Sequence, residues 1–304
     1  MKIDLWFAFR ECMYALRNKN FRKSRQWWMK WYKVYKPYLH LDVNLNEGIK
    51  PSKIPIDIII PYISKDFTTL SLVLSAARKN ILHPISSIFI VSPENEEIQR
   101  FCKENNCQFV EETLLVGFSK KDIHYVVEGQ DRSGWLLQQF IKLNGEKIST
   151  CKHFLVLDAD TIISRPRKFV HMGRTILDFA DEYHLPYYQT YEKLTGIKHH
   201  LPVSFISHCM LFEKIKLAAL KERIEKNTGM QWDKAILALN KNEHASYFSE
   251  FETYANFVLS EFPGEFECSY WFNKALPRKD RDIAADLTLF RTEKVKSLSY
   301  HTYL

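Results

Sequence analysis

Two aspartates separated by one small residue, Asp158 and Asp160, have the type and spacing best suited to chemistry in this sequence. They follow an apolar run, residues 153–157, which is typical of a buried strand in a parallel sheet. Side chains alternate along a strand, so both carboxylates can face one side where the strand ends. Carboxylates suit a hard divalent cation that also binds a phosphate or a hydroxyl. The alternative is an ordinary N-cap, in which an aspartate accepts backbone N–H groups.

The elements around this motif predict an α/β fold. Strands are expected at 54–61, 88–91 and 108–110, separated by helical patterns, and this β-α-β-α-β order indicates a parallel sheet with right-handed crossovers. Further strands are expected at 186–191 and 205–212, and further helices at 217–226, 232–240 and 249–259. The carboxyl ends of parallel strands meet at one edge of a sheet, where ligands bind.

The same edge should carry Pro61, Tyr62 and Ser92, which end the first two strands. Tyr62 is placed to stack on a planar base and Ser92 to hydrogen-bond it, although Tyr62 as an ordinary surface aromatic is an equal alternative. No glycine-rich phosphate loop of the dinucleotide or P-loop type occurs in the sequence, which disfavours phosphate binding by such a loop.

A strongly periodic helix, residues 135–143, precedes the aspartate motif. Its Gln138 and Lys142 are four residues apart and therefore share one face. Lys142 could reach a donor phosphate from there; the alternative is a solvated lysine.

The start of another helix carries two acids, Glu250 and Glu252, after Ser249. Ser-x-x-Glu is a capping box, which gives Glu252 a structural role by default. Glu250 has no such role and is free to face a cleft, so it is the first candidate for a general base, with Glu252 in reserve.

The charge is concentrated in a leader. Residues 1–36 hold ten basic and two acidic side chains, hence +8, whereas the whole chain carries +7. The body is therefore near neutral, which argues against a nucleic-acid-binding body and for local contact with an anionic surface. Tryptophan and tyrosine alternate with lysine and arginine in residues 1–38, the composition of a membrane-surface helix. Packing on the body or a dimer contact is the alternative.

Other compositional features point to a cytoplasmic protein. No run of about 18 uncharged apolar residues occurs, so a spanning helix is not expected. The six cysteines show neither a paired zinc spacing nor a dense disulfide pattern, and we interpret them as reduced thiols. A peripheral position on the inner face of the membrane remains open because of the leader.

Several of these segments together resemble GT-A fold glycosyltransferases. The segments are the first strand, the Asp-Ala-Asp motif, the Gly-Trp-Leu-Leu-Gln-Gln-Phe run at 134–140 and the Ser-Glu-Phe-Glu-Thr-Tyr run at 249–254. The last two, with the aspartate motif, are similar to a poorly characterised bacterial glycosyltransferase-like family. The resemblance covers residues 54–304 and implies a nucleotide-sugar donor, a UDP-sugar first among them, with Mn²⁺ or Mg²⁺.

The resemblance also implies roles for individual residues. Asp160 would hold the ion, and Asp158 would lie nearer the ribose or a ligand water. A histidine near the C-terminus completes the metal shell in many such enzymes, and His301 is placed for this, although a histidine in a frayed tail is more often inert. Glu250 would be the base, but retaining members can lack one, so the stereochemistry stays open. His208 fits a core or acceptor-side histidine better than a ligand.

The sequence therefore predicts a basic aromatic extension with its linker at 1–50 and a GT-A domain, with a mainly parallel sheet flanked by helices, at 51–304. The expected function is metal-dependent transfer of a sugar to a glycan or glycolipid acceptor. A nucleotidyltransferase of similar fold is one alternative. A degenerate transferase that serves as a scaffold at a membrane surface is the other, and the retained acids argue against it.

Overall fold

The computed structural model describes residues 49–180, 184–199, 204–243, 246–278, 282–290 and 295–301. The predicted extension over residues 1–50 therefore lies outside the described residues, apart from its last two positions. Its membrane or packing role stays a prediction.

The centre of the molecule is a five-stranded sheet with the order β10-β6-β1-β2-β3. Its strands are β1 (Ile56–Pro61), β2 (Ile85–Ser92), β3 (Gln108–Glu111), β6 (His153–Leu157) and β10 (Cys209–Glu213). Four of them are mutually parallel, and β10 is antiparallel to β6 at one edge. The predicted α/β class, with a mainly parallel central sheet flanked by helices, is confirmed.

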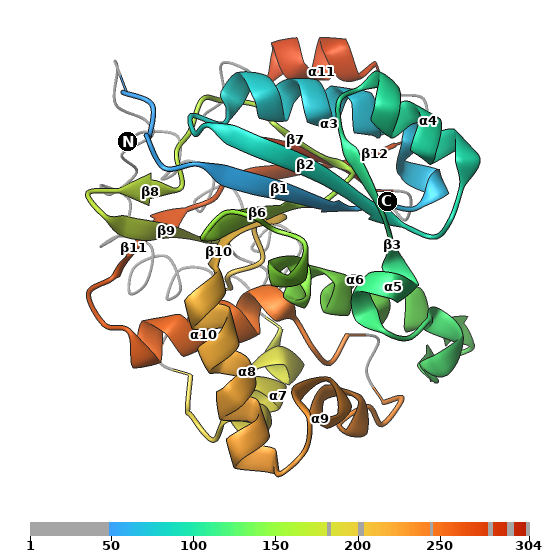
Figure 1. Ribbon diagram of the computed structural model, residues 1–304, viewed down its shortest axis with the longest axis vertical. Helices are drawn as coiled ribbons and strands as arrows, with labels where there is room; N and C mark the ends of the chain where they lie inside the picture. Colours follow the sequence, from blue (N-terminus) through green and yellow to red (C-terminus); the bar gives the residue numbers. More distant parts are fainter. Residues whose placement is uncertain are drawn as a thin grey trace, which may run out of the picture.

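Helices cover both faces of this sheet (Figure 1). On one face lie α3 (Phe67–Asn80), α4 (Glu96–Glu104) and α11 (Ile283–Leu289). On the other lie α5 (Glu112–Val116), α6 (Ser133–Leu143) and α10 (Glu250–Glu261), with α7 (Leu185–Thr195), α8 (Lys214–Thr228) and α9 (Trp232–Ala238) beyond them.

Alternation along β6 decides which layer each of its side chains enters. Phe154 and Val156 pack in the hydrophobic cluster of α6 and α10, whereas Leu155 and Leu157 pack in the cluster of α3. Asp158 continues this alternation toward α6 and α10, and Ala159 returns to the α3 side, where its carbonyl accepts the Thr69 hydroxyl at 3.0 Å. The alternation along the buried strand therefore turns the Asp158 side chain toward α6 and α10.

A smaller sheet, with the order β12-β13-β7, extends from the end of the motif. Its strands are β7 (Thr161–Ile163), β12 (Asn273–Pro277) and β13 (Ser297–His301), and β13 pairs antiparallel with β7. A second small sheet contains β8 (Val170–His171), β9 (Arg174–Phe179) and β11 (Phe266–Tyr270), and β4 (Val126–Val127) pairs with β5 (Gln130–Asp131). Single 3-10 turns are η3 (Ser64–Asp66), η4 (Lys120–Asp122) and η5 (Gly145–Lys147).

The predicted strand at 186–191 is wrong, because this segment belongs to helix α7. Its tyrosines favour a strand by propensity. However, Pro186 lies in the first turn, where a helix tolerates proline, and Gly196 ends the helix with a φ of 71°. Tyr187, Tyr191 and Leu194 are buried at helical spacing, so packing decides the conformation.

The strand expected at 205–212 forms only from Cys209 onward. Before it, the chain is irregular, because the N–H of Phe205 donates to the Glu252 carboxylate at 3.1 Å instead of to a neighbouring strand. The helices expected at 217–226, 232–240 and 249–259 are confirmed as α8, α9 and α10, with shifted ends.

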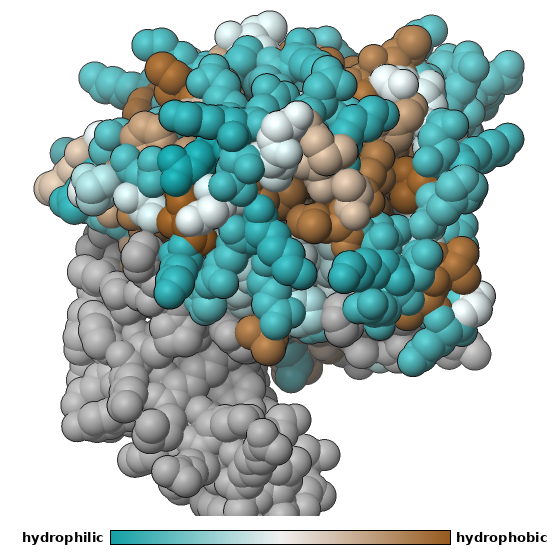
Figure 2. Space-filling view, turned by 90° about the horizontal axis from the view of Figure 1, so that it is seen from below, coloured by the Kyte–Doolittle hydropathy of each residue, from teal (hydrophilic) through white to brown (hydrophobic). Residues whose placement is uncertain are grey.

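None of the described helices combines the length and the hydropathy that crossing a membrane requires. Figure 2 shows the face that carries the lower helices of Figure 1, where hydrophobic side chains are interspersed among hydrophilic ones. The five cysteines in the described part of the chain are free.

Candidate active site

The aspartate motif lies at the carboxyl edge of the central sheet, directly after β6 and beside the end of β1. Because β10 is antiparallel, its first residues start from this same edge. The N–H of Asp158 donates to the carbonyl of His208 at 3.0 Å, and His208 has a left-handed φ of 60°. Non-glycine residues in this conformation are uncommon and concentrate at functional sites. The antiparallel direction of β10 therefore places His208 at the carboxyl edge of the central sheet.

A buried lysine connects the motif to helix α10. The Lys142 ammonium lies 2.8 Å from Asp158 Oδ1 and 2.8 Å from Glu250 Oε1. The ammonium also lies 4.5 Å from the centre of the Phe251 ring. The Lys142 and Glu250 side chains are 7% and 2% exposed, whereas that of Asp158 is 25% exposed, so Asp158 is the solvent-facing member.

The electrostatics of this triad follow from burial and from pairing. Burial alone would lower the pKa of Lys142, but the charges of Asp158 and Glu250 outweigh it and raise that pKa. Burial would raise the pKa of Asp158, yet Lys142 and His208 hold it well below its usual range. For Glu250, burial dominates over Lys142, so its pKa is raised. Asp158 is therefore a carboxylate under all ordinary conditions, and Glu250 binds protons more readily than a solvated glutamate.

The two glutamates of α10 have different environments. Ser249 is the N-cap, and its hydroxyl accepts the Glu252 N–H at 3.3 Å, which is one of the two bonds of a capping box. The Glu252 carboxylate accepts the N–H of Phe205 and contacts the Tyr188 hydroxyl at 3.4 Å. Glu252 therefore ties α10 to α7 and to the segment before β10, whereas Glu250 faces Lys142 and the motif.

Strand β13 brings the predicted metal residues together. The N–H of Tyr300 donates to the Asp160 carbonyl at 2.9 Å, and the hydroxyls of Thr161 and Ser299 lie 2.7 Å apart. At the end of β13, His301 Nδ1 lies 3.1 Å from Asp160 Oδ2. His301 is thus in an ordered strand, 8% exposed, and not in a frayed tail.

Two acid–imidazole pairs therefore stand side by side. His208 Nδ1 lies 3.3 Å from Asp158 Oδ2, and the rings of His208 and His301 are 5.6 Å apart. Carboxylate oxygen and imidazole nitrogen together suit Mn²⁺. Within the described ranges, no three histidine, cysteine, aspartate or glutamate side chains already stand in a metal-binding arrangement. The donor chemistry fits a divalent cation, and Asp160 with His301 is the pair that would hold it.

The predicted nucleotide-binding residues are less exposed than expected. Tyr62 is 3% exposed in the α3 cluster, and burial, followed by Glu97 and Asp66, raises its pKa to about 12. Pro61 is buried, and the buried Ser92 hydroxyl donates to the Pro93 carbonyl at 2.9 Å. These side chains pack at the carboxyl edge of the sheet and present little surface to a nucleotide base. Gln138 is half-buried, one turn before Lys142 on α6.

Sequence reasoning missed a second ion pair at this edge. Arg278, which follows β12, donates to Asp66 Oδ1 at 2.7 Å, to the Tyr300 carbonyl at 2.9 Å and to the Lys65 carbonyl. Burial raises the pKa of Asp66; Arg278 opposes this, and the charge of Asp160 adds to it. Arg278 therefore fixes the loop after β1 against β13. No local pattern marks the ion pair, because Asp66 and Arg278 are 212 residues apart in sequence.

Comparison with known proteins shows the family. The chain belongs to a family of unknown function, DUF6492, whose sequence model matches residues 54–301. No curated protein matches the sequence.

Several solved structures are similar in fold. Apo mouse xyloside xylosyltransferase 1 is 13% identical, with a TM-score of 0.42 over 82% of this chain and 99% of its own. An active-site mutant of LgtC is 15% identical, with a TM-score of 0.43 over 81% of this chain and 87% of its own. The glycosyltransferase GlyE of Streptococcus pneumoniae is 11% identical, with a TM-score of 0.37 over 82% of this chain and 55% of its own.

Proposed function

We propose that this protein is a metal-dependent glycosyltransferase. It would move a sugar from a nucleoside-diphosphate donor, a UDP-sugar first among them, to a glycan or glycolipid acceptor. The observation that supports this most is the meeting of Asp158, Asp160, His301, Lys142 and Glu250 at the carboxyl edge of one parallel sheet. Ligands of open α/β sheets bind at this edge.

Asp160 and His301 would hold Mn²⁺ or Mg²⁺, with Asp158 beside them. When bound, the ion would offset the negative charge that develops on the leaving diphosphate. Lys142 has a different role from the donor-phosphate contact expected at first, because its ammonium is occupied by Asp158 and Glu250. It keeps the Asp158 carboxylate ionised and fixed in position.

Glu250 would act as the general base in a direct displacement. Its carboxylate takes the proton of the acceptor hydroxyl while the acceptor oxygen bonds to the anomeric carbon. The bond from that carbon to the diphosphate oxygen breaks, and its electron pair leaves with the diphosphate. A raised pKa makes Glu250 a stronger base than a solvated glutamate, provided that it is ionised. With the side chain 2% exposed, the acceptor must reach it through a local opening.

Binding of a nucleoside diphosphate tests the proposal directly. Titration calorimetry of UDP in Mn²⁺ should show binding that disappears when the ion is chelated and in Asp160→Ala. Glu222→Ala, an exposed acid on α8, is the matched control and should bind as the native chain does. UDP binding that is indifferent to Mn²⁺ and to Asp160 would refute the metal assignment.

The cytoplasmic location and the peripheral membrane contact remain part of this proposal. Their support is the basic, aromatic composition of residues 1–38 and not any described contact.

A further inference from the structure

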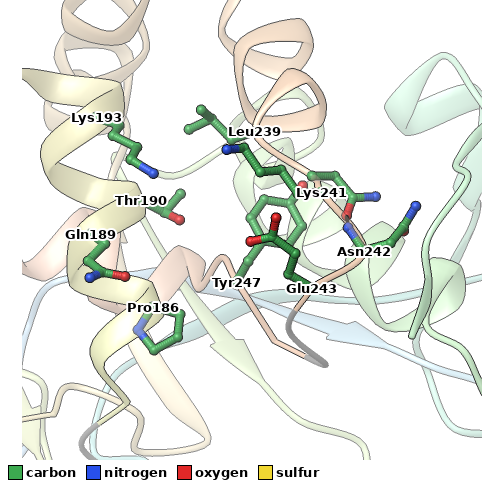
Figure 3. Close-up of a pocket in the computed structure, with 10 residues that line it drawn as sticks. Pro186, Gln189, Thr190, Lys193, Leu239, Lys241, Asn242, Glu243 and Tyr247 are labelled. Carbon is green, nitrogen blue, oxygen red and sulfur yellow. Dashed lines mark hydrogen bonds between the residues drawn. The ribbon is translucent and has the colours of Figure 1, made fainter. Parts of the chain in front are cut away.

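A cavity of about 130 Å³ lies between α7 and the loop that follows α9. Figure 3 shows its two walls, with Gln189, Thr190 and Lys193 on the helix and Lys241 and Glu243 on the loop. Its other lining residues are Pro186, Leu239, Asn240, Asn242 and Tyr247. One water takes about 30 Å³ in the liquid, so the cavity has room for about four waters. A ligand of this size is at most one sugar unit.

We propose that this cavity is a subsite for one sugar unit of the acceptor. The inference rests on the proposed function and adds to it the place where the acceptor binds. Three features carry it: the polar groups of the lining, the rigid frame that holds them, and the distance to Glu250.

The polar groups of the lining suit hydroxyls. The side chains of Gln189, Thr190, Lys193, Lys241 and Glu243 make no hydrogen bond or ion pair with the part of the chain that the structure describes. The set contains donors and acceptors, and a sugar hydroxyl can serve both. An apolar ligand would leave these groups unpaired.

The frame of the cavity is held in place by other contacts. The Asn240 amide donates to the His124 carbonyl at 2.9 Å, and Asn242 Oδ1 accepts the Val126 N–H at 3.1 Å. The Tyr247 hydroxyl donates to the Ile236 carbonyl at 3.0 Å, beneath the loop. Asn240, Asn242 and Tyr247 are therefore positioned before a ligand arrives, which lowers the entropic cost of binding.

The cavity is close to the proposed base. Tyr247 in its lining precedes Glu250 by three residues, and three residues of chain span at most about 11 Å. Helix α7, which forms the other wall, contacts Glu252 through Tyr188. The two elements that line the cavity thus also hold the start of α10. In this proposal, a saccharide in the cavity would extend toward Glu250.

Saturation-transfer NMR on the full chain, in the presence of UDP and Mn²⁺, tests the subsite. The probes are glucose, galactose, N-acetylglucosamine and glucuronate. At least one should receive saturation from the protein. In the double variant Gln189→Ala/Lys241→Ala, its dissociation constant should rise about three- to tenfold for each lost hydrogen bond. Both positions are exposed, so folding should be unaffected. Lys226→Ala, an exposed lysine on α8, should leave sugar binding unchanged.

Two results overturn the subsite: no saturation of any of the four sugars, or equal sugar binding by the native chain and the double variant. Calorimetry of UDP with Mn²⁺ on the same samples separates this from the proposed function. Normal nucleotide binding with no sugar binding contradicts only the subsite. Absence of both nucleotide binding and sugar binding contradicts the transferase proposal as well.

Discussion

The ammonium of Lys142 lies 2.8 Å from the carboxylate of Glu250 and equally close to that of Asp158. One buried cation is therefore shared by two acids from different elements, one after β6 and one at the start of α10. Through this lysine, the position and the protonation of each carboxylate depend on those of the other carboxylate.

Replacing Lys142 should destabilise the fold strongly. Lys142→Met leaves two acids near each other without their cation, and removal of one partner from a buried pair typically costs about 3–5 kcal/mol. Urea unfolding measures this loss. The double variant Lys142→Met/Glu250→Gln should lose less than the sum of its parts, because one of the stranded charges is gone. Strict additivity would show that Lys142 and Glu250 are energetically independent.

Glu250→Gln should lower turnover by about 10²-fold or more, the range expected when a general base is lost. Release of UDP from UDP-sugars, with water as the acceptor, is the assay, and calorimetric donor binding should be unchanged. Native turnover should fall as the pH drops through the raised pKa of Glu250, above the usual 4.5, because only the ionised carboxylate accepts a proton. Full turnover of Glu250→Gln would reduce Glu250 to a partner that positions Lys142.

His301→Ala should weaken Mn²⁺-dependent binding of UDP by at least about tenfold, the scale seen when metal surroundings are altered. The reason is the 3.1 Å approach of His301 to Asp160 on β13. Calorimetry at matched Mn²⁺ concentration measures it. His124→Ala, at an exposed position, is the control. If both variants bind UDP alike, His301 is only a hydrogen-bond partner of Asp160.

The stability contributed by Asp158 should depend on pH in a defined direction. Its folded pKa is held below the ordinary 3.8, so its contribution is present above that pH and is lost as the pH falls. Asp158→Asn should cost about 1.5–3 kcal/mol near neutral pH, as for a hydrogen bond to a charged group. Denaturant unfolding at several pH values should show the difference shrinking below about pH 4. A difference that grows in acid would contradict the assignment.

The basic leader should bind anionic vesicles. Replacing Arg22, Lys23 and Arg25 with serine removes three of its ten positive charges. The fraction of protein that sediments with phosphatidylserine vesicles should decrease, because each lost charge contributes about 1 kcal/mol to the free energy of binding at the membrane surface. Added salt should weaken native binding through screening. Equal sedimentation of both chains would assign these residues to packing or to self-association.

The central sheet was predictable because its strands are short apolar runs between clear breaks. Phe154 to Leu157 and Ile56 to Ile60 are buried on both sides, so their pattern needs no knowledge of partners. Helix α7 was not predictable in this way. Its tyrosines suit a strand, and only their packing and the proline in its first turn decide the outcome.

The candidate site could be proposed residue by residue but not as an arrangement. Asp158, Asp160, Lys142 and Glu250 each carry a local signal of type and spacing. The pairing of Lys142 with Glu250 does not, because it depends on the packing of α6 against α10. Arg278 and the left-handed His208 carry no signal either, since their roles arise only when β12 and β10 reach the rim.

The pairing of β7 with β13 has a consequence for biosynthesis. Asp160 and His301 are 141 residues apart in sequence, yet they meet across this pair. A ribosome that has translated the first five sixths of the sequence has already made Lys142, Asp158 and Glu250, but not this histidine. The nascent polypeptide can therefore collapse around its sheet early, while the pairing of Asp160 with His301 must await the final stretch of translation.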